Sequence, residues 1–233
     1  MQYHVIFTTI LLAFFSVGCS APQSSGDGKP DTTNQPANII LLIGDGMGVS
    51  QLSSAYYFGE AEPNFSKFPV VGLSRTSSSS HKITDSAAGA TAFASGIKTY
   101  NGAIGVDADA NPSEAIMELL SAQGWNTGII STSSVTHATP ACFYAHVPQR
   151  SMQEEIARQM VYSELDFVAG GGYKWFLNRT DSVNYLDSLT AKGFMVDTNS
   201  INANLATDDK LVYLLAADGM PKITEERGDF LLD

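Results

Sequence analysis

Residues 83–105 constrain the fold of this chain most strongly, because they join a serine to a run of small residues suited to a closely packed helix. The segment reads I-T-D-S-A-A-G-A-T-A-F-A-S-G-I-K-T-Y-N-G-A-I-G. Ser86 falls in the first turn of the predicted helix, where unpaired N–H groups and the helix dipole stabilise an oxyanion or a phosphate. The alternative is that Thr84, Asp85 or Ser86 serves only as an N-cap, where Ser, Thr and Asp are common.

A second segment places a carboxylate at the end of an apolar run. Residues 38–43 read N-I-I-L-L-I, which is typical of a strand covered on both faces in a parallel sheet. The run continues as G-D-G-M-G, so we expect Asp45 just past the strand end, where ligands bind in open α/β sheets. The alternative is a turn in which Asp45 makes a local hydrogen bond.

A third segment ends in an arginine. Residues 136–150 read T-H-A-T-P-A-C-F-Y-A-H-V-P-Q-R. The guanidinium of Arg150 is suited to phosphate, because its planar fork donates two parallel hydrogen bonds and stays charged. Taken by itself, Arg150 is more often a surface charge.

These three segments, in this order, resemble alkaline phosphatases, and D-F-V-A-G-G-G at 166–172 adds a fourth match. The resemblance implies that Ser86 is the nucleophile, phosphorylated by substrate and then dephosphorylated by water, and also a metal ligand. It implies that Asp45 bridges a zinc and the magnesium. A sulfatase or phosphodiesterase of the same superfamily is a weaker alternative, because those proteins usually have threonine or a modified cysteine in place of Ser86.

The same resemblance assigns roles to three residues of the third segment. Thr139 would supply a hydroxyl ligand to magnesium, and Arg150 would bind the substrate phosphate. His137 stands where some bacterial members have an aspartate that holds magnesium through water, so it is included in the predicted metal site. An imidazole is a poorer partner for magnesium and favours another metal.

The resemblance implies two zinc ions and one magnesium ion as cofactors. Each zinc needs about three protein ligands, and His81, His137 and His146 are not spaced as a zinc pair. His81 is predicted to be a solvated surface residue and His146 a structural one. In the family the remaining ligands come from the carboxyl-terminal half of a longer domain. We therefore expect residues 37–233 to be a partial alkaline phosphatase domain that is not active alone.

The predicted fold class is α/β, an alkaline-phosphatase-like three-layer sandwich with a mostly parallel central sheet, incomplete at the carboxyl end. The alternation of helical and strand patterns supports this class. Ser113 is predicted to cap one helix and Gly124 to end it. Helices are predicted over 49–58, 113–123, 152–163 and 181–192, in addition to the small-residue helix that has Ser86 in its first turn. Strands are predicted over 38–43, 68–74, 125–131, 166–169, 193–197 and 210–217.

The amino terminus indicates export. An apolar run over 5–17 is too short to span a bilayer comfortably but suits a signal-peptide core. Residues 1–19 are predicted to be a signal peptide whose small residues before Cys19 resemble a lipoprotein cleavage site, with a plain secretory signal as the alternative. Residues 20–36 read as a flexible tether. The predicted location is periplasmic or cell-surface, with Cys19 as the lipid anchor.

The acidic balance excludes one class of partner. A net charge of −11 argues against a nucleic-acid-binding face. The predicted partners are phosphomonoester substrates, a membrane through the lipid anchor and a second copy of the chain in a homodimer. The leading hypothesis is a metal-dependent phosphomonoester hydrolase. The alternative is a non-catalytic, truncated surface lipoprotein that at most binds phosphate or a partner.

Overall fold

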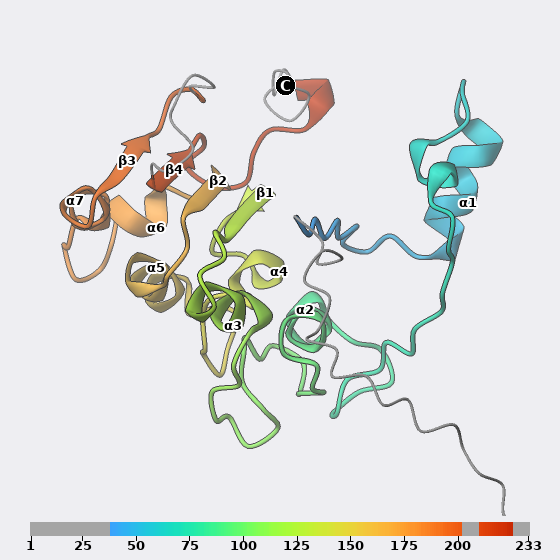
Figure 1. Cartoon of the computed structure of the whole chain (residues 1–233), viewed down its shortest axis with the longest axis horizontal. Helices are drawn as coiled ribbons and strands as arrows, with labels where there is room; N and C mark the ends of the chain where they lie inside the picture. Colours follow the sequence, from blue (N-terminus) through green and yellow to red (C-terminus); the bar gives the residue numbers. More distant parts are fainter. Residues whose placement is uncertain (1–37, 202–209, 226–233) are drawn as a thin grey trace, which may run out of the picture. The chain divides into compact units, whose positions relative to one another are not determined.

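The computed structural model describes residues 38–201 and 210–225 (Figure 1). The predicted signal peptide, Cys19 and the tether lie outside the described residues. The chain divides into two units, residues 1–43 and 44–233, and the sheet and the candidate site belong to the second.

The second unit is built on a parallel sheet of four strands in the order β1-β2-β4-β3. Central strand β2 pairs Val168 with Ile129 on one side and with Val212 on the other. Parallel neighbours need a crossover. Helices α4 and α5 lie in the chain between β1 and β2, and α6, α7 and β3 lie between β2 and its other neighbour, β4. The strands are β1 Gly128–Ser134, β2 Phe167–Gly171, β3 Phe194–Asp197 and β4 Lys210–Leu214.

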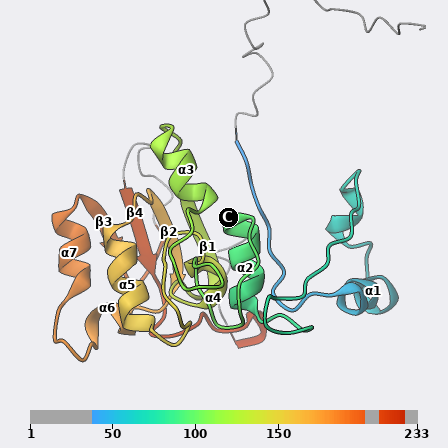
Figure 2. The same cartoon turned by 90° about the horizontal axis from the view of Figure 1, so that it is seen from below.

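Apart from α1, the helices of the described residues form two groups. Contacts join α5, α6 and α7, with α7 on β3, whereas α2 contacts α3 and α4, and α4 contacts β1. Figure 2 shows the first group toward the β3 side of the sheet and the second toward the β1 side. The helices are α1 Val49–Phe58, α2 Ser86–Ser95, α3 Ile116–Ala122, α4 Ala138–Ala141, α5 Gln153–Tyr162, α6 Lys174–Leu177 and α7 Tyr185–Ala191, with 3₁₀ turns at Asn64–Lys67 and Ile223–Glu225.

Helix α2 packs closely because its buried side chains are small. Ala87, Ala88, Ala90 and Ala94 are each at most 3% exposed. The helix ends at Gly96, whose φ of 69° is the left-handed conformation that glycine adopts without strain. Small side chains therefore bring the α2 backbone, with Ser86 at its start, against α4. The largest fully buried side chains come from the strands, from α5 to α7 and from loop residues such as Ile104 and Val147.

Two predicted strands are wrong. Residues 38–43 and 68–74 form no strand, and Ile40, Leu42, Val70 and Leu73 are between 77% and 94% exposed. A strand exists only where a neighbour accepts its hydrogen bonds, and neither segment pairs with another among the described residues. The apolar composition of these segments shows that they could be buried, but it does not show whether another strand lies beside them.

Several predicted boundaries shift for local reasons. Helix α3 begins at Ile116 because Glu118 accepts a hydrogen bond from the amide of Ala115, so Ser113 is not its cap. Strand β1 begins at Gly128 because the Trp125 amide donates back to the carbonyl of Leu120 and keeps the intervening residues in a turn.

Helix α7 begins later than predicted. Asn184, whose side chain accepts from the amides of Leu186 and Asp187, is its cap. The predicted helix over 49–58 is confirmed, and so is the small-residue helix with Ser86 in its first turn. The helix predicted over 152–163 is confirmed to within a residue at each end. None of the helices in the described ranges is long and apolar enough to cross a membrane.

Candidate active site

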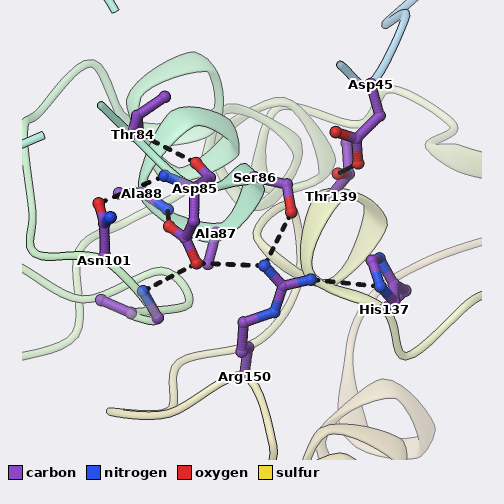
Figure 3. A network of polar contacts seen from close by, with 12 residues as sticks. Asp45, Thr84, Asp85, Ser86, Ala87, Ala88, Asn101, His137, Thr139 and Arg150 are labelled. Atoms are coloured by element: carbon purple, nitrogen blue, oxygen red, sulfur yellow. Dashed lines mark hydrogen bonds and ion pairs between the residues drawn. The ribbon is translucent and has the colours of Figure 1, made fainter. Parts of the chain in front are cut away.

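Ser86 is the first residue of α2, and its neighbour Asp85 is the cap. The Asp85 carboxylate accepts a hydrogen bond from the amide of Ala88 at 3.0 Å. The capping role that the sequence left open among three residues is therefore filled by Asp85. The Ser86 hydroxyl instead faces the guanidinium of Arg150, as Figure 3 shows.

Arg150 connects three side chains. Its Nη1 donates to Ser86 Oγ at 2.9 Å and to Asp85 Oδ2 at 3.1 Å, and its Nη2 donates to His137 Nε2 at 3.2 Å (Figure 3). The Arg150 side chain is 31% exposed and that of Asp85 is 25% exposed. The guanidinium is thus fixed at one face and open to solvent at another, an arrangement suited to a small anion.

The backbone of Arg150 is held on both sides. Its amide donates to the carbonyl of Gly102 at 2.7 Å. Its carbonyl accepts from Nε2 of Gln153, at the start of α5, at 3.1 Å. Because both main-chain groups are bonded, the direction in which the side chain leaves the backbone is set before any ligand binds.

Asp85 is ionised by its surroundings. Its Oδ2 accepts from the amide of Gly102 at 3.0 Å as well as from Arg150. Burial raises the pKa of Asp85, but the hydrogen bonds from Ala88, Gly102 and Arg150 outweigh it, so the pKa lies below its ordinary 3.8. A permanent carboxylate here holds Arg150 against Ser86.

His137 is neutral in this arrangement. Arginine is always a donor, so His137 Nε2 must accept and the ring proton sits on Nδ1. Burial, followed by the positive charge of Arg150, lowers the pKa of His137 from its ordinary 6.5. A neutral imidazole keeps a lone pair on Nε2, which accepts from Arg150 here and could bind a cation only if Arg150 moved away.

Asp45 and Thr139 form a second contact in this region. Thr139 Oγ1 donates to Asp45 Oδ2 at 2.9 Å. Thr139 lies on α4, whose N-cap residue is His137. The structure therefore joins all five residues named by the sequence analysis through two sets of contacts linked by α4 (Figure 3).

The donor set fits one of the two expected metals. A carboxylate and hydroxyl oxygens are the ligands that magnesium prefers, and Asp45, Thr139 and Ser86 supply them. Two zinc ions need about three protein ligands each. Within residues 38–201 and 210–225 no group of three or more His, Cys, Asp or Glu side chains could hold a metal ion. The described residues thus do not fit the two zinc sites.

The other two histidines of the described ranges lie outside this constellation. His81 is exposed, with Nδ1 2.7 Å from the hydroxyl of Ser80. His146 is bonded to Gly105 and Glu118. Gln153 was not predicted from the sequence, and Asp85 was predicted only as a possible N-cap. The adjacency of Asp85 to Ser86 was a usable signal, but the contact to Arg150 spans 65 positions.

The site thus combines a parallel α/β fold with a serine at a helix N-terminus that faces an arginine. Comparisons with known proteins name the family. A sequence model of the alkaline phosphatase family matches residues 36–231. This chain belongs to the alkaline phosphatase family.

Individual proteins of known name that resemble this chain are also alkaline phosphatases. The alkaline phosphatase of Schizosaccharomyces pombe is 41% identical over 224 residues, covering 88% of this chain and 42% of that protein. Alkaline phosphatase 3 of Bacillus subtilis is 32% identical over 238 residues, covering 96% of this chain and 51% of that protein. The chain thus spans about half the length of the curated relatives it matches.

A solved structure shares the fold. The alkaline phosphatase of the Antarctic bacterium TAB5 matches with a TM-score of 0.78 and 46% identity, over 80% of this chain and 55% of that one. A variant of that protein, with a histidine changed to aspartate, has magnesium bound in the site named M3.

Proposed function

We propose that the full-length protein is a metal-dependent phosphomonoester hydrolase that acts through a phosphoserine on Ser86. The observation that carries the proposal is the 2.9 Å contact from Arg150 Nη1 to Ser86 Oγ at the first turn of α2. A nucleophile, a phosphate-binding cation and the amide-rich end of a helix are thereby directed at one point.

The residues divide the reaction between them. Ser86 Oγ attacks phosphorus, the bond from phosphorus to the ester oxygen breaks, and the alcohol leaves with a proton. Water then attacks the phosphoserine, the bond to Ser86 breaks, and phosphate is released. Arg150 exchanges its contacts with Ser86 and His137 for two phosphate oxygens, while its bond to Asp85 keeps it in place.

Asp45, Ser86, Thr139 and His137 are the proposed metal ligands. Bound metal ions would supply Lewis acidity and lower the pKa of a hydroxyl or water. The oxygen-rich contact between Asp45 and Thr139 supports magnesium there. In the TAB5 variant that binds magnesium, an aspartate replaces a histidine. We propose that His137 plays the role of that histidine.

The remaining assignments concern location and assembly. We infer a signal peptide over 1–19 with a lipidated Cys19, a tether over 20–36 and a phosphatase domain from residue 37. The protein would then be exported and anchored at a membrane, acting on phosphomonoesters, and two copies would form a homodimer. A Cys19→Ser variant should leave the membrane fraction or remain unprocessed, whereas equal partitioning of both forms would contradict lipidation.

One assay tests the activity. The full-length protein should hydrolyse an aryl phosphate at alkaline pH, lose that activity to a chelator and regain it with zinc and magnesium. Aryl sulfate and a phosphodiester serve as comparison substrates. Faster turnover of either, or activity that survives thorough metal removal, would contradict the proposal.

A further inference from the structure

His146 lies outside the proposed ligands and substrate contacts, yet it bonds to two other segments through its ring. Its Nδ1 is 2.6 Å from the carbonyl oxygen of Gly105, and its Nε2 is 2.9 Å from Oε1 of Glu118 on α3. A carbonyl and an ionised carboxylate only accept, whereas a neutral imidazole has a single N–H. The full set of bonds therefore requires an imidazolium that donates twice.

The charges around the ring favour this form. Glu118 is the charged side chain that contacts it directly. On α5, Gln159 accepts from the His146 amide at 2.7 Å and separates the ring segment from the ion pair between Glu155 and Arg158. On the third side, Gly105 offers only its backbone.

Asp107 is the acidic residue nearest to Gly105 in the chain, and its carboxylate points into the loop that follows it and not toward His146. Its carboxylate accepts from the amides of Asp109 and Asn111, both at 2.9 Å. The hydrogen bond to Glu118 raises the pKa of His146 against the opposing effect of burial. Burial raises the pKa of Glu118, but the bond from His146 outweighs it and the pKa is lowered.

The ring contact lies beside a single antiparallel bridge, called the ladder below together with the contact from Arg150 to Gly102. Ile104 and Val147 exchange both backbone hydrogen bonds, at 3.0 and 2.9 Å. Three residues further on, the Arg150 amide donates to the carbonyl of Gly102. The contact that holds the Arg150 backbone is thus at the opposite end of this pairing from His146.

The backbone at Gly105 lies so close to Ala145 and His146 that there is no room for a side chain. Gly105 has a φ of +55°, and a Cβ there would lie 2.2 Å from the carbonyl oxygen of Ala145 and 2.9 Å from His146 Nδ1. The Gly105 carbonyl also accepts from the Ser113 amide at 2.9 Å, so the same atom joins the ladder to the chain that leads into α3.

We propose that His146 is a positioning residue. As an imidazolium bridging Glu118 and Gly105, it keeps residues 102–106 and 145–150 in register and so fixes where Arg150 lies beside Ser86. Loss of its second proton removes one donated hydrogen bond and loosens Arg150. The inference rests on the proposed function only in that the ligand of Arg150 is phosphate.

The sign of the pH effect follows from the two groups. The contribution of His146, whose pKa is raised, is complete below the ordinary 6.5 and is lost as pH rises through the folded value. The contribution of Glu118, whose pKa is lowered, is complete above the ordinary 4.5 and is lost as pH falls through the folded value. Above neutrality the ladder should therefore weaken, and the hold on phosphate with it.

Amide hydrogen exchange in the full-length protein tests the mechanical part without activity. In His146→Gln, exchange at Val147 and Arg150 should become faster by about tenfold, because the end of the ladder opens locally. His81→Gln, which changes an exposed histidine, is the matched control and should leave both amides unchanged. Unchanged exchange in His146→Gln would overturn the proposal.

Binding of inorganic phosphate, measured by calorimetry from pH 6 to 9, tests the consequence. The affinity of the unaltered protein for phosphate should fall as the pH rises through the pKa of His146. The carbon-13 NMR shifts of the His146 ring report that titration. Glu118→Gln retains an acceptor without a charge, so it should move this inflection to lower pH, and His146→Gln should abolish it. A purely structural role would lower stability without moving the inflection.

The outcomes separate the two proposals. If exchange and the inflection both respond while no phosphoserine forms, the proposed reaction fails and the positioning role stands. If phosphoserine forms and the inflection is unmoved in Glu118→Gln, the positioning role fails and the reaction stands. Glu118→Gln also keeps the inference falsifiable should His146→Gln fail to fold.

Discussion

Arg150 Nη1 and Asp85 Oδ2 lie 3.1 Å apart although 65 positions separate the residues in the chain. The same Nη1 reaches Ser86 Oγ at 2.9 Å. Asp85 therefore caps the start of α2 and at the same time directs the arginine at the neighbouring serine. The cap and the site share one carboxylate, so a change at Asp85 should affect both stability and phosphate binding.

Replacing Asp85 tests the stability part. Asp85→Ala should lower the free energy of unfolding by about 1–2 kcal/mol, because a cap and a partly exposed ion pair are lost. The pKa of Asp85 is lowered from 3.8, so its contribution is present above that pH and disappears as pH falls through the folded value. Asp85→Asn should flatten the acid limb of a denaturation series. An unchanged acid limb would show that the carboxylate is not ionised by these contacts.

Arg150→Ala should weaken binding of inorganic phosphate by about 10- to 100-fold, since charge-assisted hydrogen bonds are lost. The phosphate affinity of Arg150→Lys should lie between those of the unaltered protein and Arg150→Ala, because lysine keeps the charge without the planar fork. Arg75→Ala, at an exposed arginine, is the control for a simple change of net charge. Calorimetry on the full-length protein measures all three, and equal affinity in Arg150→Ala and Arg75→Ala would remove Arg150 from the substrate site.

His137→Asp should raise the affinity for magnesium, because a carboxylate oxygen replaces an imidazole nitrogen as a ligand. His137→Asn is the matched variant, offering an oxygen without the charge, and should have a smaller effect. The Asp variant also places a second anion beside Arg150, so phosphate affinity should fall. Titration calorimetry with magnesium decides the matter. Magnesium binding unchanged by the aspartate would place His137 outside the metal site.

The thiol of Cys142 should be unreactive in the folded protein. It is fully buried, and burial raises its pKa from 9.0 to about 11. Iodoacetamide at pH 8 should label Cys142 slowly in the native state and readily in guanidinium chloride, as followed by peptide mapping. Labelling at the same rate in both states would contradict the packing of α4 against α2.

The sequence predicted best the helices that are determined by interactions between residues only a few positions apart. Helix α2 has a cap before it and small residues along it, so its start at Ser86 follows from neighbouring residues. Helix α5 was predicted equally well because its apolar residues, such as Ile156 and Met160, recur at helical spacing. In both cases the relevant interactions span only a few positions.

Residues 38–43 show the opposite case. An apolar run predicts a buried strand only if other chain segments cover it, and Leu42 is 77% exposed. The contacts of Arg150 with Asp85 and His137 were equally beyond the sequence, because they depend on how α2, α4 and the loop before α5 meet. The resemblance named Ser86, Thr139 and Arg150, but the intermediary role of Asp85 needed the geometry.

The most direct test of the central claim is trapping of the covalent intermediate. The full-length protein, with its metals, is mixed with a radiolabelled phosphomonoester at acidic pH, quenched and digested, and the labelled peptide is sequenced. Label should appear on Ser86 and be absent from Ser86→Ala, while Asp85 still caps α2 and the variant unfolds at a similar temperature. Label on any other residue, or unaltered turnover in a folded Ser86→Ala, would contradict the account.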